Sequence, residues 1–232
     1  DVLTLLPTGA GKSLCFQVPT ITNGGVCIVI SPLIALMQDQ VKDLLDKNIS
    51  AVNLGGQITP DAEEIILSEA KKGKYQFIYC SPEKLAQTNF QNFLSQLTIQ
   101  LFAIDEAHCI SQWGYDFRPA YRKLSVLKKL FPKVPILAMT ASAIPLVQDD
   151  IIKQLALEKP AVITDQFLRA NLKYSIHLVP VKLHSCRLIL NELKGAVIIY
   201  CNTRNNVSQL TNLLKAYKYK VDEYHAGLSI ET

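Results

Sequence analysis

The first eighteen residues, Asp1 to Val18, decide the fold and read DVLTLLPTGAGKSLCFQV. An apolar segment at Val2–Leu6 is followed by a glycine-containing turn and then by a second apolar stretch that predicts a helix. Gly9 and Gly11 allow the turn to curl, so that successive backbone N–H groups point inward at an anion. This order of strand, glycine-rich turn and helix predicts a phosphate-binding loop on a parallel α/β sheet.

The turn also carries the side chains that phosphate binding requires. Lys12 offers a positive charge for β and γ phosphates, and the Ser13 hydroxyl offers a ligand for Mg²⁺. The predicted nucleotide-binding residues are Thr8, Gly9, Ala10, Gly11, Lys12 and Ser13. Leu6 stands where the usual motif has glycine, but the strand–loop–helix context favours a phosphate loop over an ordinary tight turn.

Short apolar runs alternate with amphipathic stretches along nearly the whole chain. In the first part we expect strands at Val2–Leu6, Val26–Ser31, Ala51–Leu54, Gln76–Cys80, Leu101–Asp105, Ile136–Thr140 and Ala161–Thr164. Helices are expected at residues 36–45, 62–72, 121–130 and 146–155. Because each strand is apolar throughout, it suits a parallel sheet covered on both faces. The chain is therefore predicted to be a doubly wound α/β protein, whose ligands bind at the carboxyl ends of the strands.

The pattern breaks at a polar connector near residues 165–173 and then restarts. Further strands are expected at Tyr174–Val179, Ala196–Cys201 and Tyr219–Tyr224, with helices at residues 183–193 and 205–217. We therefore expect a first domain over residues 1–165 and the beginning of a second, similar domain over residues 166–232. The chain opens inside a strand and closes where a helix is expected to begin, as a fragment would.

Composition limits the class of protein. Of 232 residues, 49% are apolar and 19% are charged, which is typical of globular proteins rather than disordered ones. The net charge of +4 permits a polyanionic partner without arguing for one. The six cysteines lack the spacing of a metal site and are expected to be buried free thiols. No apolar run is long enough to span a bilayer, so we expect an intracellular protein without membrane contact.

A second stretch, LFAIDEAH from Leu101 to His108, places two carboxylates directly after an apolar strand. Asp105 is predicted to hold Mg²⁺ and Glu106 to orient and deprotonate an attacking water. His108 is a further catalytic candidate, although a single histidine after a strand is usually structural. Together with the phosphate loop, the two carboxylates favour nucleotide hydrolysis over phosphate transfer to a small molecule.

The residues that follow, CISQWGYDFRPAY from Cys109 to Tyr121, resemble the aromatic-rich loop of RecQ-family helicases. The resemblance implies RecA-like domains and an ATP-dependent motor that moves 3′ to 5′ on DNA in repair and recombination. Trp113, Phe117 and Arg118 then occupy the positions that couple DNA binding to ATP hydrolysis, by stacking on bases and holding the backbone. Tyr115 stands where the family usually has histidine and cannot carry a positive charge at neutral pH.

Other segments resemble further motifs of this family in the same order. Those implied to contact DNA contribute Ser31, Pro32, Gln38, Ser81 and Pro82 in the first domain and Asn202, Arg204 and His225 in the second. Residues 138–143 are similar to the motif that links the nucleotide to the grip on DNA, and residues 167–172 to the interdomain segment. The implied cofactors are ATP and Mg²⁺, and the implied partners are single-stranded DNA and duplex junctions. The expected location is a bacterial cytoplasm or nucleoid, or a eukaryotic nucleus.

Three alternatives stay open. An RNA helicase is the nearest, and the sequence QWGYDFRP disfavours it. The others are a non-unwinding, ATP-regulated module that binds or anneals DNA, and a phosphate-loop nucleotidase unrelated to nucleic acid. In the family that the chain resembles, the adenine-recognising segment would precede Asp1 and the arginine finger would follow Thr232. We therefore expect these residues alone to bind nucleotide and DNA weakly and not to unwind.

Overall fold

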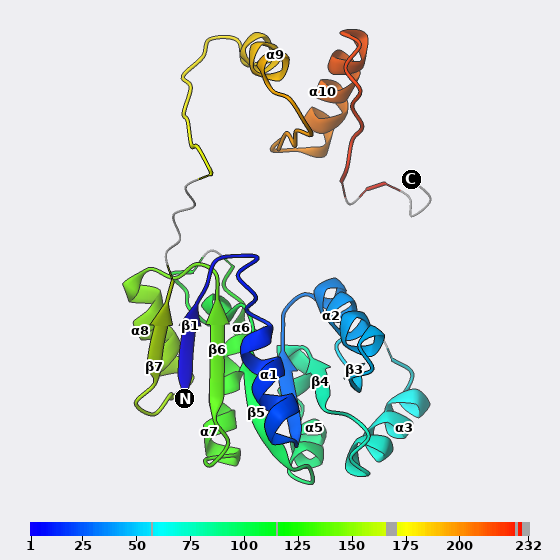
Figure 1. The fold of residues 1–232 in the computed structure, drawn as a ribbon, viewed down its shortest axis with the longest axis vertical. Helices are drawn as coiled ribbons and strands as arrows, with labels where there is room; N and C mark the ends of the chain where they lie inside the picture. The colour runs from blue at the N-terminus through cyan, green and yellow to red at the C-terminus, as the bar shows by residue number, and fades with distance from the viewer. Residues whose placement is uncertain (57, 115, 166–170, 226, 229–232) are drawn as a thin grey trace. The chain divides into compact units, whose positions relative to one another are not determined.

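The computed structural model describes residues 1–56, 58–114, 116–165, 171–225 and 227–228 (Figure 1). The chain divides into two compact units, Asp1–Leu172 and Lys173–Thr232. The assignment of domains to residues 1–165 and 166–232 stays a prediction. Tyr115 and most of the predicted interdomain segment, residues 167–170, lie outside the described residues.

A seven-stranded sheet organises the first unit. Its strands are β1 (Val2–Leu5), β2 (Val26–Ile30), β3 (Ala51–Asn53), β4 (Phe77–Cys80), β5 (Ile99–Ile104), β6 (Ile136–Thr140) and β7 (Ala161–Thr164). They lie in the order β3-β4-β2-β5-β6-β1-β7, and all the pairs are parallel. The strands expected in this part of the chain are therefore confirmed, with bounds that differ by one or two residues at most.

Alternate residues of β1 to β6 face opposite sides of the sheet and contribute to two separate hydrophobic cores, whereas the residues of β7 are exposed. In β2, for example, Ile28 belongs to one core and Cys27 to the other. Helices α1 (Leu14–Asn23) and α2 (Ile34–Asp46) pack on one face, and the remaining helices of this unit pack on the opposite face (Figure 1). This arrangement confirms the predicted doubly wound α/β fold.

The helices on the opposite face are α3 (Pro60–Lys71), α4 (Pro82–Leu85), α5 (Thr88–Leu94), α6 (Pro119–Arg122), α7 (Val126–Leu130) and α8 (Pro145–Gln154), with the 3-10 turns η1 (Ala107–Ile110) and η2 (Lys123–Ser125). The expectation of one helix over residues 121–130 is wrong, because this stretch divides into α6, η2 and α7. The Ser125 hydroxyl donates to the Arg122 carbonyl at 3.1 Å, and a side-chain bond of this kind competes with continuous helical bonding.

The strand order brings the carboxyl ends of β1, β6, β5 and β2 next to one another at one edge of the sheet. The phosphate loop follows β1, Thr140 ends β6, Asp105 follows β5 and Ser31 follows β2. The Leu6 N–H donates to the Thr140 carbonyl at 3.2 Å, so the loop is tied to β6. Segments that are far apart in the sequence therefore meet at this edge.

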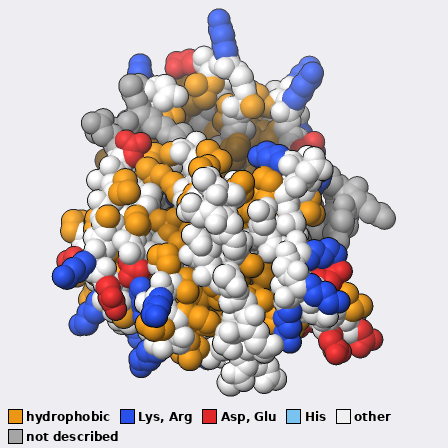
Figure 2. Space-filling model, turned by 60° about the horizontal axis from the view of Figure 1, so that its bottom comes forward, with side chains coloured by type: hydrophobic (Ala, Val, Ile, Leu, Met, Phe, Trp, Pro, Cys, Tyr) orange, Lys and Arg blue, Asp and Glu red, His pale blue; other side chains and the backbone are white. Residues whose placement is uncertain are grey.

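Figure 2 views the molecule toward the edge where the strands begin and shows apolar side chains near the middle of this face. A cavity of about 410 Å³ lies beside α1, and its lining includes Val2, Pro19, Leu101 and Pro135. This lining is mainly apolar, in contrast to the polar groups at the carboxyl ends of the strands.

The second unit contains α9 (Lys182–Glu192) and α10 (Arg204–Ala216), which confirm the helices expected there. The strands expected at residues 174–179, 196–201 and 219–224 are wrong for the structure, since none of these described segments is paired as a strand. Many of their apolar side chains are exposed, with Leu178 at 98% and Tyr200 at 91%. A strand needs a neighbour to bond its backbone groups, and no such sheet is assembled in the described part of this unit.

The six cysteines are free thiols, and the expected burial is found for Cys27, Cys80 and Cys109, whereas Cys15, Cys186 and Cys201 are only partly buried. Among the described residues, no group of three His, Cys, Asp or Glu side chains is arranged to hold a metal ion. Within the same residues, no helix combines the length and hydropathy that crossing a membrane requires.

Candidate functional site

The phosphate loop occupies residues 7–13 between β1 and α1. Gly9 and Gly11 have φ values of 83° and 80°, a left-handed conformation that favours glycine over residues with a Cβ atom. Helix α1 begins at Leu14, so its positive N-terminal end adds to the N–H groups of the loop. The structure therefore forms the strand–loop–helix arrangement that the sequence predicts.

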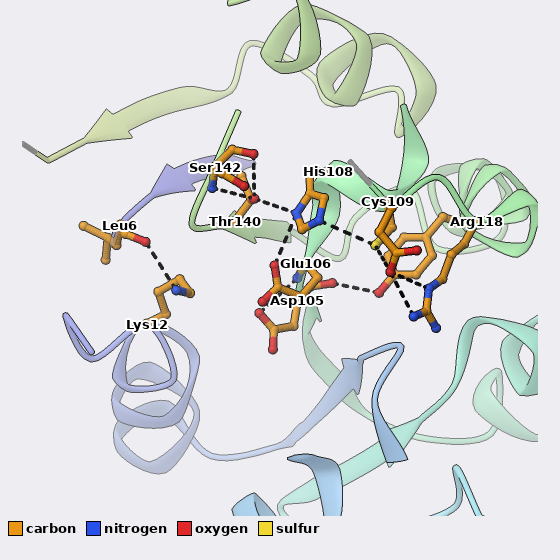
Figure 3. A network of polar contacts seen from close by, with 11 residues as sticks. Leu6, Lys12, Asp105, Glu106, His108, Cys109, Arg118, Thr140 and Ser142 are labelled. Carbon is orange, nitrogen blue, oxygen red and sulfur yellow. Dashed lines mark hydrogen bonds and ion pairs between the residues drawn. The ribbon is translucent and has the colours of Figure 1, made fainter. Parts of the chain in front are cut away.

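The loop presents its residues to different degrees. Thr8, Gly9 and Ala10 are exposed, whereas Gly11, Lys12 and Ser13 are partly buried. The Lys12 ammonium donates to the Leu6 carbonyl at 3.3 Å, across the loop. Burial dominates the pKa of Asp105 and the hydrogen bond from His108 dominates that of Glu106, but the Lys12 charge acts on both carboxylates and so lies within electrostatic reach of them (Figure 3).

Asp105 lies buried at the end of β5, where its N–H donates to the Ile30 carbonyl at 2.8 Å. Burial, and next the neighbouring charge of Glu106, raises the pKa of the Asp105 carboxyl to about 6. Two carboxylates that share one nearby lysine leave negative charge uncompensated. Together with the Ser13 hydroxyl, this all-oxygen set of donors fits Mg²⁺ bound between protein and phosphate oxygens.

Glu106 has a φ of 48°, which is uncommon for a residue other than glycine and is typical of functional sites. Its carboxylate oxygen Oε2 lies 3.2 Å from Nδ1 of His108. This hydrogen bond lowers the pKa of Glu106, so the carboxylate remains ionised at neutral pH. An ionised carboxylate beside the phosphate loop can accept a hydrogen bond or a proton from water.

His108 connects the Glu106 carboxylate to β6. Its Nδ1 lies 2.9 Å from the Thr140 hydroxyl oxygen, which in turn accepts the Ser142 N–H at 3.2 Å. Nδ1 can form one hydrogen bond, and the oxygens of Glu106 and Thr140 both lie within reach of it. The structure therefore gives His108 specific partners after β5 and on β6, which the residue type alone does not predict.

The aromatic-rich loop, residues 111–118, follows η1. Trp113 is 68% exposed, whereas Phe117 is partly buried with the Arg122 guanidinium 5.1 Å from its ring centre. The Arg118 Nη1 donates to the Pro32 carbonyl at 3.0 Å, although 86 positions separate the two residues. The structure thus brings this loop to the end of β2, beside the predicted Ser31–Pro32 motif.

The other predicted DNA contacts differ in exposure. Gln38 is exposed on α2, whereas Ser31 and Pro82 are buried. The Ser81 hydroxyl accepts the Lys84 N–H at 3.2 Å and caps α4. A DNA-binding role for these four residues stays a prediction.

Three further predicted contacts belong to the second unit. Arg204 is the first residue of α10, Asn202 precedes the helix, and His225 accepts the Gly227 N–H at Nδ1 over 3.1 Å. Their roles also stay predictions.

Sequence reasoning did not single out three residues that the structure places at the site. The Tyr121 hydroxyl donates to the Asp105 carbonyl at 2.9 Å, Thr140 contacts His108, and Asp116 pairs with Arg118. The signal for Asp116 was its position two residues before an arginine. Thr140 and Tyr121 lie within motifs that the sequence indicates, but their contacts with His108 and Asp105 depend on how the chain folds and have no local signal.

Known proteins are similar to this chain over most of its length. The family described as DEAD/DEAH box helicase matches residues 1–150. The ATP-dependent DNA helicase RecQ of Pasteurella multocida is 40% identical over 230 residues, which cover 98% of this chain and 36% of that protein. RecQ of Bacillus subtilis is 40% identical over 97% of this chain and 38% of its own length. The RecQ-like DNA helicase BLM of Xenopus laevis is 40% identical over 99% of this chain and 18% of that protein.

The chain spans less than two fifths of the length of these relatives. Among solved structures, the DUF1998 helicase MrfA is similar over 94% of this chain and 36% of the MrfA chain, with a TM-score of 0.68 and 16% identity. The structure of MrfA bound to DNA is similar over 71% of this chain and 23% of the MrfA chain, with a TM-score of 0.56 and 17% identity. These likenesses show the fold alone. From the family match and the similarity along nearly its whole length, the chain belongs to the DEAD/DEAH box helicase family and, within it, groups with the RecQ helicases.

Proposed function

We propose that the chain is the nucleotide-hydrolysing part of an ATP-dependent DNA helicase. One observation carries this proposal: the catalytic segment Asp105–His108 continues directly into the loop that presents Trp113 to solvent. The carboxylates lie within electrostatic reach of Lys12, and the exposed indole suits stacking on an unpaired base. A nucleotide site and a base-stacking side chain therefore belong to one short segment.

In hydrolysis, the N–H groups of residues 8–13 and the Lys12 ammonium hold the phosphates of ATP. Ser13 and Asp105 would hold Mg²⁺, which when bound neutralises charge on the phosphate oxygens. Glu106 orients a water molecule and accepts its proton as the water oxygen attacks the γ-phosphorus and the bond to the leaving ADP oxygen breaks. His108 keeps the Glu106 carboxylate ionised and oriented.

In this proposal the aromatic-rich loop binds DNA. Trp113 stacks on a base of a single strand, a contact that is worth about 1–3 kcal/mol and does not depend on the base sequence. Phe117 and Arg118 complete the contact, and the first unit alone provides a weak grip. For the full-length protein we propose 3′ to 5′ unwinding at junctions of single-stranded and duplex DNA, in repair and recombination inside the cell.

A strand-separation assay with the full-length protein tests this function. We expect ATP- and Mg²⁺-dependent separation of a DNA duplex with a 3′ single-stranded tail, and little separation when the tail is 5′. Glu106→Gln, which keeps the size of the side chain, should still bind ATP but lose separation.

The controls distinguish the alternatives. Preference for a tailed RNA duplex would indicate an RNA helicase. DNA binding or annealing that persists unchanged in Glu106→Gln, without any separation by the wild type, would indicate an ATP-regulated binding module.

A further inference from the structure

Arg118 is the basic residue of the aromatic-rich loop, and protein oxygens hold its guanidinium on two sides. Its Nε and Nη2 lie 3.0 Å and 2.9 Å from Oδ2 of Asp116, and its Nη1 donates to the Pro32 carbonyl at 3.0 Å. The hydrogen bond that Arg118 donates to Asp116 is also the largest factor that raises the pKa of Arg118. The arginine that the loop offers to DNA is therefore already paired.

The Asp116 carboxylate occupies the side of the guanidinium that a phosphate would use. Arginine binds carboxylates and phosphates alike through neighbouring N–H groups, and Nε with Nη2 forms one such pair. A phosphate oxygen cannot accept from both nitrogens while Oδ2 of Asp116 does so. The two side chains are 33% and 55% exposed, so an approaching strand can reach and replace this pair.

Asp116 also faces the catalytic segment. Its Oδ2 lies 3.9 Å from the Cys109 sulfur, which lies 3.9 Å from Nε2 of His108 (Figure 3). These sulfur contacts are long and weak, so Asp116 is joined only loosely to the histidine beside Glu106.

Resting on the proposed function, we propose that Asp116 is a positioning residue that competes with DNA phosphate for Arg118. In the DNA-free protein the carboxylate holds the guanidinium against Pro32, and a bound strand replaces it. Asp116 thus sets the concentration of single strands at which the loop engages, while Asp105 and Glu106 carry out the hydrolysis.

The test is DNA-stimulated ATP hydrolysis by the full-length protein, with oligothymidylate as a strand that forms no duplex. Asp116→Asn should lower the half-saturating DNA concentration about two- to fivefold, as expected for loss of an exposed ion pair, at an unchanged maximal rate. Asp116→Glu, which keeps the charge, should behave like the wild type. Asp149→Asn, the same change at an exposed position of α8, controls for a general effect of net charge.

A double-mutant cycle shows whether Asp116 acts through Arg118. In an Arg118→Ala background, Asp116→Asn should have no further effect on the half-saturating concentration. An unchanged value for Asp116→Asn, an equal gain in Asp149→Asn, or a gain that persists without Arg118 would overturn the inference alone. Wild-type hydrolysis that DNA does not stimulate would overturn both the inference and the proposed function.

Discussion

Nδ1 of His108 lies 2.9 Å from the hydroxyl oxygen of Thr140, although the two residues are 32 positions apart in the sequence. The same nitrogen lies 3.2 Å from the carboxylate of Glu106. Because Thr140 ends β6 and Glu106 follows β5, the imidazole joins two neighbouring strand ends. A shift of β6 relative to β5 would therefore move the partners of the Glu106 carboxylate, for which we propose the role of orienting water.

Removal of the Thr140 hydroxyl should slow ATP hydrolysis without preventing ATP binding. We expect Thr140→Val to lower kcat about three- to tenfold, which corresponds to the free energy of about one hydrogen bond. Thr140→Ser, which keeps the hydroxyl, should have a kcat close to that of the wild type. His108→Ala should have a larger effect, about tenfold or more, because Glu106 then loses its direct partner. Steady-state kinetics measure these rates, and equal kcat values for Thr140→Val and Thr140→Ser would contradict the role of this contact.

The buried carboxyl of Asp105 should destabilise the folded protein at neutral pH. Its pKa of about 6 lies above the ordinary value of 3.8, so the folded protein binds this proton more tightly than the unfolded chain does. The contribution to the free energy of unfolding therefore falls as pH rises from about 4 to about 6, by up to about 3 kcal/mol. This cost remains in full at higher pH.

Asp105→Asn should accordingly raise the free energy of unfolding by up to about 3 kcal/mol at about pH 7.5. The gain should shrink toward zero as pH falls to about 3, where the wild-type carboxyl is mostly protonated in both states. Urea unfolding in the presence of a chelator measures the difference at each pH. A loss of stability of similar size at both pH values would show that this charge is not what limits stability.

Gly114 allows the aromatic-rich loop to approach η1 closely. A Cβ atom at this position would lie 2.5 Å from the His108 carbonyl oxygen, so either the loop or η1 must move. We expect Gly114→Ala to cost about 1–3 kcal/mol of stability, as overpacking does, and to abolish most of the DNA stimulation of ATP hydrolysis. Gly56→Ala is the matched control, because its Cβ would meet only the Ile34 side chain at 3.8 Å. Equal behaviour of the two variants would refute the role of the close approach.

Lys12 should contribute to ATP binding rather than to folding. Lys12→Met removes its charge, and loss of a charged hydrogen bond to phosphate should raise the Kd for ATP about tenfold to hundredfold. Titration with a fluorescent ATP analogue measures the change, and thermal unfolding shows whether the fold is retained. An unchanged Kd in a folded variant would remove Lys12 from the nucleotide site.

Much of the first unit could be predicted because its strands are continuous apolar runs, and the residues that follow them reach one edge of the sheet. Asp105, Glu106 and the phosphate loop are therefore visible in the sequence as endings of strands. The pairs His108–Thr140 and Arg118–Pro32 are not, because they depend on which strands are neighbours. The left-handed conformation of Glu106 likewise has no local signal in the sequence.

In the second unit, the strands that the sequence predicts do not form. Residues 174–179 and 196–201 have strand-like composition, yet they are not paired in the described structure. Apolar composition reports a preference for a buried sheet, whereas a strand forms only when a neighbour supplies hydrogen bonds. By contrast, α9 and α10 satisfy their backbone groups internally, and their bounds follow the sequence pattern closely.

DNA-dependent ATP hydrolysis through Trp113 is tested by measuring hydrolysis by the full-length protein, with and without single-stranded DNA, beside a Trp113→Ala variant. Trp113 is 68% exposed, so its removal leaves the core unchanged. We expect DNA to stimulate the wild type strongly, and the variant to lose most of that stimulation at a similar DNA-free rate. Hydrolysis that is indifferent to DNA would contradict this expectation and leave a phosphate-loop nucleotidase.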